Sequence, residues 1–188
     1  MTRTAPQTTG LVEGASDQAA VEVLARRRGR DLGDEGISVV PMGGATNIGH
    51  FLRRLGPEGE DLRLAGLCDV GEERKIRHGL ERAGLGSNLT RDSMELLGFF
   101  VCVLDLEDEM IRSLGTAAVE GVIEDQGEMG SFRIFQRQPA QRERTIEAQL
   151  RRFLGTHSGR KILYGGLLAE ALDLDRVPRP IDALLAYV

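Results

Sequence analysis

The stretch Leu11–Asp17, which reads LVEGASD, sets the pattern from which the fold can be predicted. It opens with two apolar residues, continues through Glu13 and a glycine, and then offers Ser16 or Asp17 as a helix N-cap. Apolar residues follow at helical spacing until Gly29, which suits the end of a helix. The stretch therefore predicts a strand, a tight loop and a helix, with Glu13 directly after the strand.

Three further apolar runs repeat this arrangement along the chain. They cover Ile37–Val40, Leu62–Leu67 and Phe99–Leu104, and each is followed by a segment with apolar residues at helical spacing. Strands that alternate with helices are typical of α/β domains. We therefore predict the α/β class, with a central, mainly parallel sheet of about four strands flanked by helices.

The rest of the chain is predicted to be almost entirely helical. Beyond Gly115, the main helices are expected over Arg142–Leu154 and Lys161–Leu172, and two prolines precede a short terminal helix. The segment Phe132–Phe135 is the exception, and we interpret it as a strand or a turn. The domain thus carries extra C-terminal helices.

Composition narrows the class of protein. The 188 residues suffice for one α/β domain, and 41% apolar with 28% charged residues is ordinary for a globular protein. No apolar run approaches a membrane span, and the N-terminus lacks the pattern of an export signal, so we expect a cytoplasmic protein with no membrane partner. Cys68 and Cys102 lie in apolar strands and are expected to be buried, unpaired thiols.

The net charge of −5 argues against binding nucleic acid through global positive charge. Local basic stretches remain at Arg26–Arg30 and at Arg151-Arg152. The simpler interpretation of both is a set of solvated arginines on helix surfaces.

Acidic residues follow three of the predicted strands. Glu13 comes after the first strand, Asp69 after the third and Asp105 after the fourth. Ligands of open α/β sheets bind beyond the carboxyl ends of the strands, so these acids are expected to meet. Clustered carboxylates repel one another unless a hard divalent cation, such as Mg²⁺ or Mn²⁺, binds them. The alternative for any one acid is a solvated residue or a helix cap, and for Asp17 or Glu109 taken alone this is the better interpretation.

The same residues carry a resemblance to a known family. Leu11–Asp17 resembles the first motif of the TOPRIM superfamily, which includes topoisomerases, bacterial primases, recombination proteins and the nuclease domain of the OLD (overcoming lysogenization defect) family. Further stretches resemble the OLD-type branch in order: Val39–Gly44, Gly66–Asp69, Leu104–Met110 and Gly159–Lys161. The likeness covers most of the chain. It implies a TOPRIM (Rossmann-like) fold and a metal-dependent nuclease that acts on DNA.

The resemblance also implies the roles of individual residues. Six acids would bind two Mg²⁺ or Mn²⁺ ions: Glu13, Asp17, Asp69, Asp105, Glu107 and Glu109. Glu13 and Asp69 would serve one ion, Asp105 and Glu107 the other, and Lys161 would be the family's late catalytic lysine. Glu13, Asp69 and Asp105 are likewise expected to be catalytic. An ordinary position in the first turn of a helix is an equally good interpretation of Lys161.

The implied organisation is a single TOPRIM domain over residues 1–188. Its core would cover about 8–115, and the helical part at about 116–188 would complete the site by supplying Lys161. The phosphate-binding loop of ATPases, G-x-x-x-x-G-K-[S/T], does not occur in these residues, so any ATPase is expected to be a separate partner protein. No organic cofactor is expected.

One departure from the superfamily leaves the activity open. Members commonly have two aspartates separated by one residue, whereas this chain reads Asp69-Val70-Gly71, and Glu72 or Glu73 would have to substitute. The main alternative is therefore a catalytically weak or inactive TOPRIM module that binds nucleic acid or a partner protein. Primase-like nucleotidyl transfer ranks last.

Overall fold

The computed structural model describes residues 7–188, apart from the side chain of Ser158. Its four strands form one sheet in the order β2-β1-β3-β4, and every neighbouring pair is parallel. The strands are β1 (Thr8–Val12), β2 (Ile37–Pro41), β3 (Arg63–Asp69) and β4 (Phe99–Cys102). The structure confirms the predicted α/β class and the four-stranded parallel sheet. The first six residues of the predicted domain lie outside the described part.

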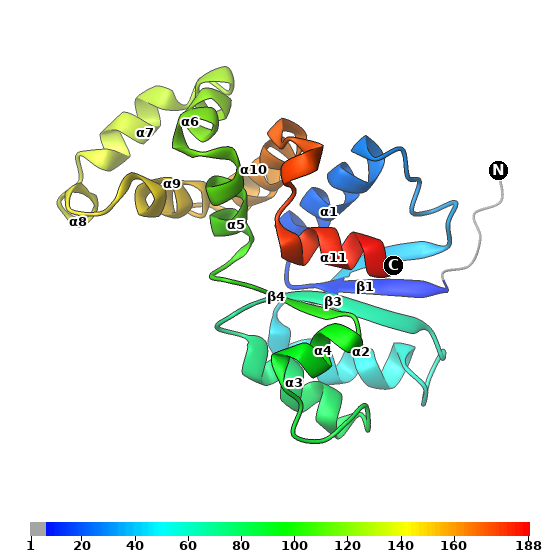
Figure 1. The fold of residues 1–188 in the computed structure, drawn as a ribbon. Coiled ribbons are helices and arrows are strands. Elements are labelled where there is room, and N and C mark those ends of the chain that lie inside the picture. Colours follow the sequence, from blue (N-terminus) through cyan, green and yellow to red (C-terminus); the bar gives the residue numbers. More distant parts are fainter. Residues whose placement is uncertain (1–6) are drawn as a thin grey trace.

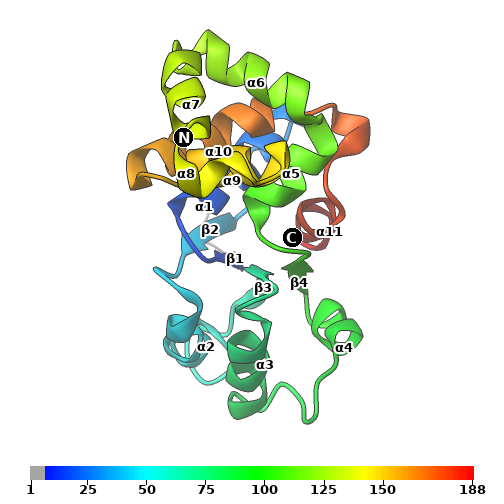
Figure 2. The ribbon, with the colours of Figure 1, turned by 90° about the vertical axis from the view of Figure 1, so that its left-hand side faces the viewer.

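Helices cover both faces of the sheet (Figure 1). One face carries α1 (Ala15–Arg27) and α11 (Arg179–Tyr187), with α10 (Ser158–Ala171) packed against α1. The other face carries α2 (Ile48–Leu55), α3 (Glu73–Arg82) and α4 (Arg91–Leu96), preceded by the 3-10 turn Ala45–Asn47. Figure 2 shows the sheet end-on between these two layers.

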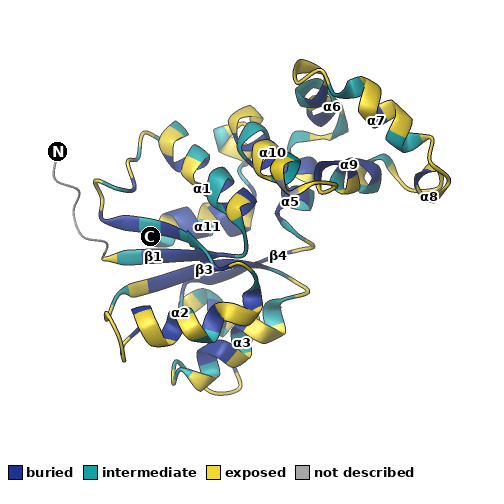
Figure 3. Cartoon of the chain, turned by 180° about the vertical axis from the view of Figure 1, so that it is seen from behind, coloured by how far each residue is buried: buried dark blue, intermediate teal, exposed yellow. Residues whose placement is uncertain are grey.

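The side chains of each strand alternate between the two faces of the sheet and so contribute to two hydrophobic cores. Successive strand residues point to opposite faces, so Leu11 packs beneath α2 and α3, whereas Val12 packs in the larger core on the other side. Leu67 and Cys68 divide between the same two cores in β3. Figure 3 shows the resulting buried strands between helices whose outer surfaces are exposed. Cys68 is, as predicted, a buried free thiol, and so is Cys102.

The remaining helices extend from the layers beside α10 (Figure 1). They are α5 (Leu106–Leu114), α6 (Thr116–Asp125), α7 (Met129–Gln136), α8 (Pro139–Arg142) and α9 (Ile146–Leu154), and a 3-10 turn at Leu174–Arg176 leads into α11. Contacts of α5 with α9 and α10 join them to the rest. Within residues 7–188, no helix is both long enough and apolar enough to cross a membrane.

Several predicted boundaries were wrong. Strand β4 ends at Cys102, because Val103 and Leu104 leave the sheet and are 57% and 45% exposed. Phe132–Phe135 is helical, since Phe132 is fully buried and Phe135 stands one turn later on the same side, against Phe153.

Other predictions missed a break or a cap. The helix expected over Arg142–Leu154 is divided, because the Thr145 hydroxyl accepts a hydrogen bond from the Ala148 N–H and starts α9. Gly14, and not Ser16 or Asp17, is the N-cap of α1.

Candidate metal centre and its surroundings

Glu13 and Asp69 lie together at the carboxyl ends of neighbouring strands. Glu13 follows β1 and Asp69 ends β3, and the Asp69 N–H donates a 2.7 Å hydrogen bond to Glu13 Oε1. This bond holds the Glu13 carboxylate against the end of β3. The structure thus brings together two acids that are 56 residues apart in sequence.

Asp17 faces the same place from the first turn of α1. It is buried, its Oδ2 accepts a 2.8 Å hydrogen bond from the Gly14 N–H, and its Oδ1 lies 3.4 Å from the Ser16 hydroxyl. Asp17 therefore reaches back to cap the helix. Its charge also raises the pKa values of Glu13 and Asp69, so it belongs to the same cluster.

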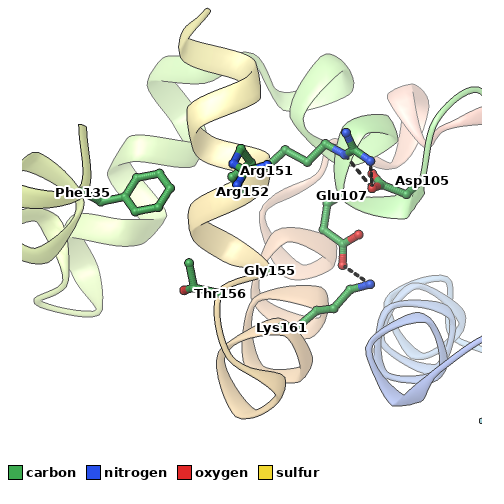
Figure 4. Close-up of a pocket in the computed structure, with 8 residues that line it drawn as sticks. All are labelled: Asp105, Glu107, Phe135, Arg151, Arg152, Gly155, Thr156 and Lys161. Atoms are coloured by element: carbon green, nitrogen blue, oxygen red, sulfur yellow. Dashed lines mark hydrogen bonds and ion pairs between the residues drawn. The ribbon is translucent and has the colours of Figure 1, made fainter. Parts of the chain in front are cut away.

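Asp105 and Glu107 approach from α5, and each is already paired with a cation (Figure 4). Asp105 is the N-cap of α5, with Oδ1 accepting from the Asp108 N–H at 2.9 Å, and its Oδ2 lies 2.5 Å from the Arg151 guanidinium. Glu107 is buried, and its Oε1 lies 3.3 Å from Lys161 Nζ.

The carboxylates act on one another electrostatically. Burial, and then the charges of Glu13, Asp17 and Asp105, raise the pKa of Asp69 to about 8, with Lys161 acting in the opposite direction. The pKa values of Glu13, Asp17 and Glu107 are raised as well, in each case chiefly by burial. The negative charge of the cluster is thus only partly compensated by the positive charge of the neighbouring cations.

Lys161 is the cation within this cluster. Burial lowers its pKa, but the carboxylates of Glu107 and Asp17 outweigh that effect, so the pKa lies above its ordinary value. The ammonium group consequently stays protonated at neutral pH, in contact with Glu107.

The oxygen-only donor set fits a hard divalent cation such as Mg²⁺ or Mn²⁺. The side chains are not in a coordinating arrangement, because in residues 7–188 no three acidic, histidine or cysteine side chains are grouped closely enough to hold an ion. Glu13 is bound to a backbone N–H and Asp105 to Arg151. Metal binding would require these carboxylates to turn from their present partners.

Glu109 is not brought to the cluster. Its Oε1 accepts a 2.7 Å hydrogen bond from the Val103 N–H, and its Oε2 lies 2.8 Å from the Arg112 guanidinium. The carboxylate therefore supports the loop between β4 and α5. The placement gives no support to its predicted role as a metal ligand.

The place of the absent second aspartate is partly covered by Glu72. Its charge raises the pKa of Glu13, and its buried Oε2 lies 2.5 Å from Lys75 Nζ, an ion-pair contact without hydrogen-bond geometry. Glu73 instead pairs with Arg91 at 2.5 Å. Of the two glutamates considered as substitutes, Glu72 is the one that lies near the cluster.

Arg151 is a residue of this site that the sequence did not identify. The interpretation of Arg151-Arg152 as solvated arginines holds only for Arg152, which is exposed, whereas Arg151 binds Asp105. No sequence signal joins two residues 46 positions apart. The stretch Arg26–Arg30 is likewise engaged, because all four of its arginines pair with the acids Glu170, Asp182 and Glu35.

A cavity of about 390 Å³ adjoins the acids on the side of α7 and α9 (Figure 4). Its walls combine acidic, basic, aromatic and small residues: Asp105, Glu107, Phe135, Arg151, Arg152, Gly155, Thr156 and Lys161.

The parallel sheet, with carboxylates at its carboxyl edge, defines an α/β domain whose acids lie at the edge where such sheets bind their ligands. A family model described as the TOPRIM domain of overcoming lysogenization defect protein-like sequences matches residues 8–64. Those residues carry the pattern of an OLD-like TOPRIM domain, which confirms the resemblance drawn from the sequence.

Solved structures extend the likeness to nearly the whole chain. The C-terminal region of the Burkholderia pseudomallei OLD protein superimposes with a TM-score of 0.74 at 20% identity, covering 97% of this chain and 96% of that one. The C-terminal region of the Xanthomonas campestris pv. campestris OLD protein gives a TM-score of 0.72 at 25% identity, with 97% and 94% covered. The chain therefore has the fold of these OLD C-terminal regions. Among curated proteins, none matches this sequence.

Proposed function

We propose that this chain is a divalent-metal-dependent phosphodiester hydrolase that cleaves DNA through a two-metal carboxylate site. The observation that supports it is the convergence of acids from β1, α1, β3 and α5, where burial and then the neighbouring carboxylates raise the pKa of Asp69 to about 8. Such repulsion lowers the stability of a folded protein unless a cation offsets it.

The proposed ligands divide into two groups, each acting on one Mg²⁺ or Mn²⁺ ion. Glu13, Asp17 and Asp69 would hold the first ion, and Asp105 and Glu107 the second. When bound, two such ions supply an activated water and stabilise the leaving oxygen.

Lys161 would contribute a positive charge at the substrate phosphate, independently of the metal ions. Its protonated ammonium lies among the acids and is 40% exposed as a side chain, so it can contact a phosphate oxygen of the substrate. A fixed positive charge there would stabilise the charge that develops on the phosphate in the transition state. Glu107, its present partner, holds it in place before the substrate binds.

A second candidate function has specific support. Gly71 stands where the superfamily commonly has an acid, and two of the proposed ligands are already neutralised by Arg151 and Lys161. These features favour a non-catalytic TOPRIM module that binds nucleic acid or a partner protein. The proposal includes DNA as the substrate and a separate ATPase as a partner. The ATPase partner is tested by assaying cleavage with and without ATP and the ATPase protein.

The test is nicking of supercoiled plasmid DNA in Mg²⁺ or Mn²⁺. Glu13→Gln and Lys161→Met are the test variants, and Glu124→Gln, at an exposed position on α6, is the matched control. We expect the wild type and the control to nick DNA, and both test variants to lose about 100-fold or more in rate. Nicking that survives Glu13→Gln contradicts the proposed site. DNA binding without nicking by any of the proteins would favour the non-catalytic module.

A further inference from the structure

The charges that line the cavity beside the acids are paired in part. On its wall, Asp105 pairs with Arg151 and Glu107 pairs with Lys161, so these charges are matched. Arg152, also on the cavity wall, is exposed and forms no ion pair within residues 7–188. An anion in the cavity thus has one guanidinium available to it, that of Arg152, beside the acidic cluster.

The opposite wall presents an aromatic ring. Phe135 is half-buried, and one side of it packs against Phe153 in a T-shaped contact with ring centroids 5.6 Å apart. Figure 4 shows its ring directed across the cavity toward α9, the helix that carries Arg151 and Arg152. This contact with Phe153 fixes the ring, so little conformational entropy is lost when a flat ligand stacks on it.

The hydroxyl of Thr156 completes the polar lining. It already donates a 2.7 Å hydrogen bond to the Phe153 carbonyl, so its oxygen retains capacity only as an acceptor. That oxygen also accepts from the Arg160 guanidinium at 2.6 Å. Thr156 therefore shapes the cavity, and the ligand-binding groups are the Arg152 cation and the Phe135 ring.

A cation next to an aromatic ring is the arrangement that proteins use for single-stranded nucleic acid, because the ring stacks on a base while the cation holds the phosphate. We propose that this cavity binds one nucleotide of an unpaired DNA strand, with its phosphate on Arg152 and its base on Phe135, adjacent to the phosphate at the acidic cluster. The inference rests on the proposed function and adds a substrate class: DNA with a single-stranded or frayed segment. A paired base would first have to leave the duplex stack before it reached Phe135.

The test is binding without cleavage, measured by fluorescence anisotropy in EDTA and separately in Ca²⁺. The probes are a fluorescein-labelled oligothymidylate and a labelled blunt hairpin duplex. The wild type should bind the single strand more tightly than the duplex. Phe135→Leu should weaken single-strand binding about tenfold and duplex binding much less, because stacking on one base is worth about one to two orders of magnitude in affinity.

Two comparisons separate stacking and charge from a loss of folding. Phe135→Tyr keeps a ring and should bind like the wild type, whereas Arg152→Gln should reduce the slope of log affinity against log salt by about 0.7. Arg176→Gln is the matched control, since Arg176 is exposed and lies away from the cavity lining. It should leave the single-strand preference unchanged.

Equal affinity for the two DNAs, absence of binding to both, or a Phe135→Leu protein with unchanged single-strand affinity overturns the inference. Its failure is distinguishable from failure of the proposed function. A preference for single-stranded DNA without nicking contradicts only the proposed hydrolase activity. Nicking without that preference contradicts only the proposed nucleotide binding in the cavity.

Discussion

At Asp69, burial and three neighbouring carboxylates raise the pKa from an ordinary 3.8 to about 8. Between these values the folded protein binds more protons than the unfolded chain, so without metal the stability should fall as the pH rises. We expect the melting temperature in EDTA to decrease from about pH 5 to about pH 8. Thermal unfolding over a pH series checks this, and Asp69→Asn should flatten the decline. A decline that is equally steep in the Asn variant assigns it to other groups.

Gly71 offers a second test at the scale of a single residue. A Cβ added there has no neighbour within 4 Å, and the position does not require a left-handed backbone. Gly71→Asp should therefore fold normally and add the acid that the superfamily commonly has, which would tighten Mn²⁺ binding roughly tenfold. Gly71→Asn, which has the same shape and no charge, is its control in a calorimetric titration. Equal Mn²⁺ affinity in the two variants would place residue 71 outside the metal centre.

The positions of the acids could be predicted only in part. The carboxyl ends of parallel strands lie at one edge of a sheet. This rule correctly predicted that Glu13 and Asp69 lie close together. The pairing of Asp105 with Arg151 could not be predicted in this way, because it depends on how α9 packs and on which rotamers the two side chains adopt. The roles of all the site residues remain predictions.

At the scale of elements, the packing of α10 against α1 decides where Lys161 lies. Gly165, one turn after Lys161, faces the backbone of Ser16, and a Cβ there would lie 2.6 Å from the Ser16 carbonyl oxygen. Gly165→Ala must therefore move α10 away from α1. We expect a loss of about 1–3 kcal/mol in the free energy of unfolding, together with weaker Mn²⁺ binding.

The adjacent Gly166 provides the control for this substitution. A Cβ there would meet the Val23 side chain at 3.8 Å, an ordinary contact. Gly166→Ala should be neutral, or stabilising by up to about 1 kcal/mol, because alanine favours helix. Urea unfolding of the two variants tests the prediction, and equal stabilities would contradict the close approach of α10 to α1.

Element prediction succeeded where a continuous apolar run had clear end signals, and failed where a short segment had few buried apolar residues. Strand β2 was predicted to within one residue of its observed bounds, because its β-branched residues are followed by a proline and two glycines. The six-residue helix α4 was missed, since it has one buried apolar residue, Met94, and depends on its Thr90 cap. In α7, the sequence around the two phenylalanines did not distinguish a helix from a strand. The helix is favoured by their packing against Phe153, which lies in another helix.

For the whole molecule, the site depends on segments far apart in the chain. The part matched by the family model contains Glu13 and Asp17, whereas Asp105 and Lys161 come from later helices. Two further helices beyond the matched part, α9 and α7, supply Arg152 and Phe135, the residues assigned to the unpaired nucleotide. A metal ion bound by these residues should therefore link the sheet to α5 and α10. The free energy of unfolding should then increase with metal concentration.

Calorimetric titration of the metal-free protein with Mn²⁺ tests the central claim most directly. The wild type and Glu124→Gln should show saturable binding at millimolar affinity or tighter, and Asp69→Asn should bind at least about tenfold more weakly. The absence of saturable Mn²⁺ binding by the wild type at millimolar concentrations, or the same affinity in Asp69→Asn, would contradict a metal centre at these carboxylates.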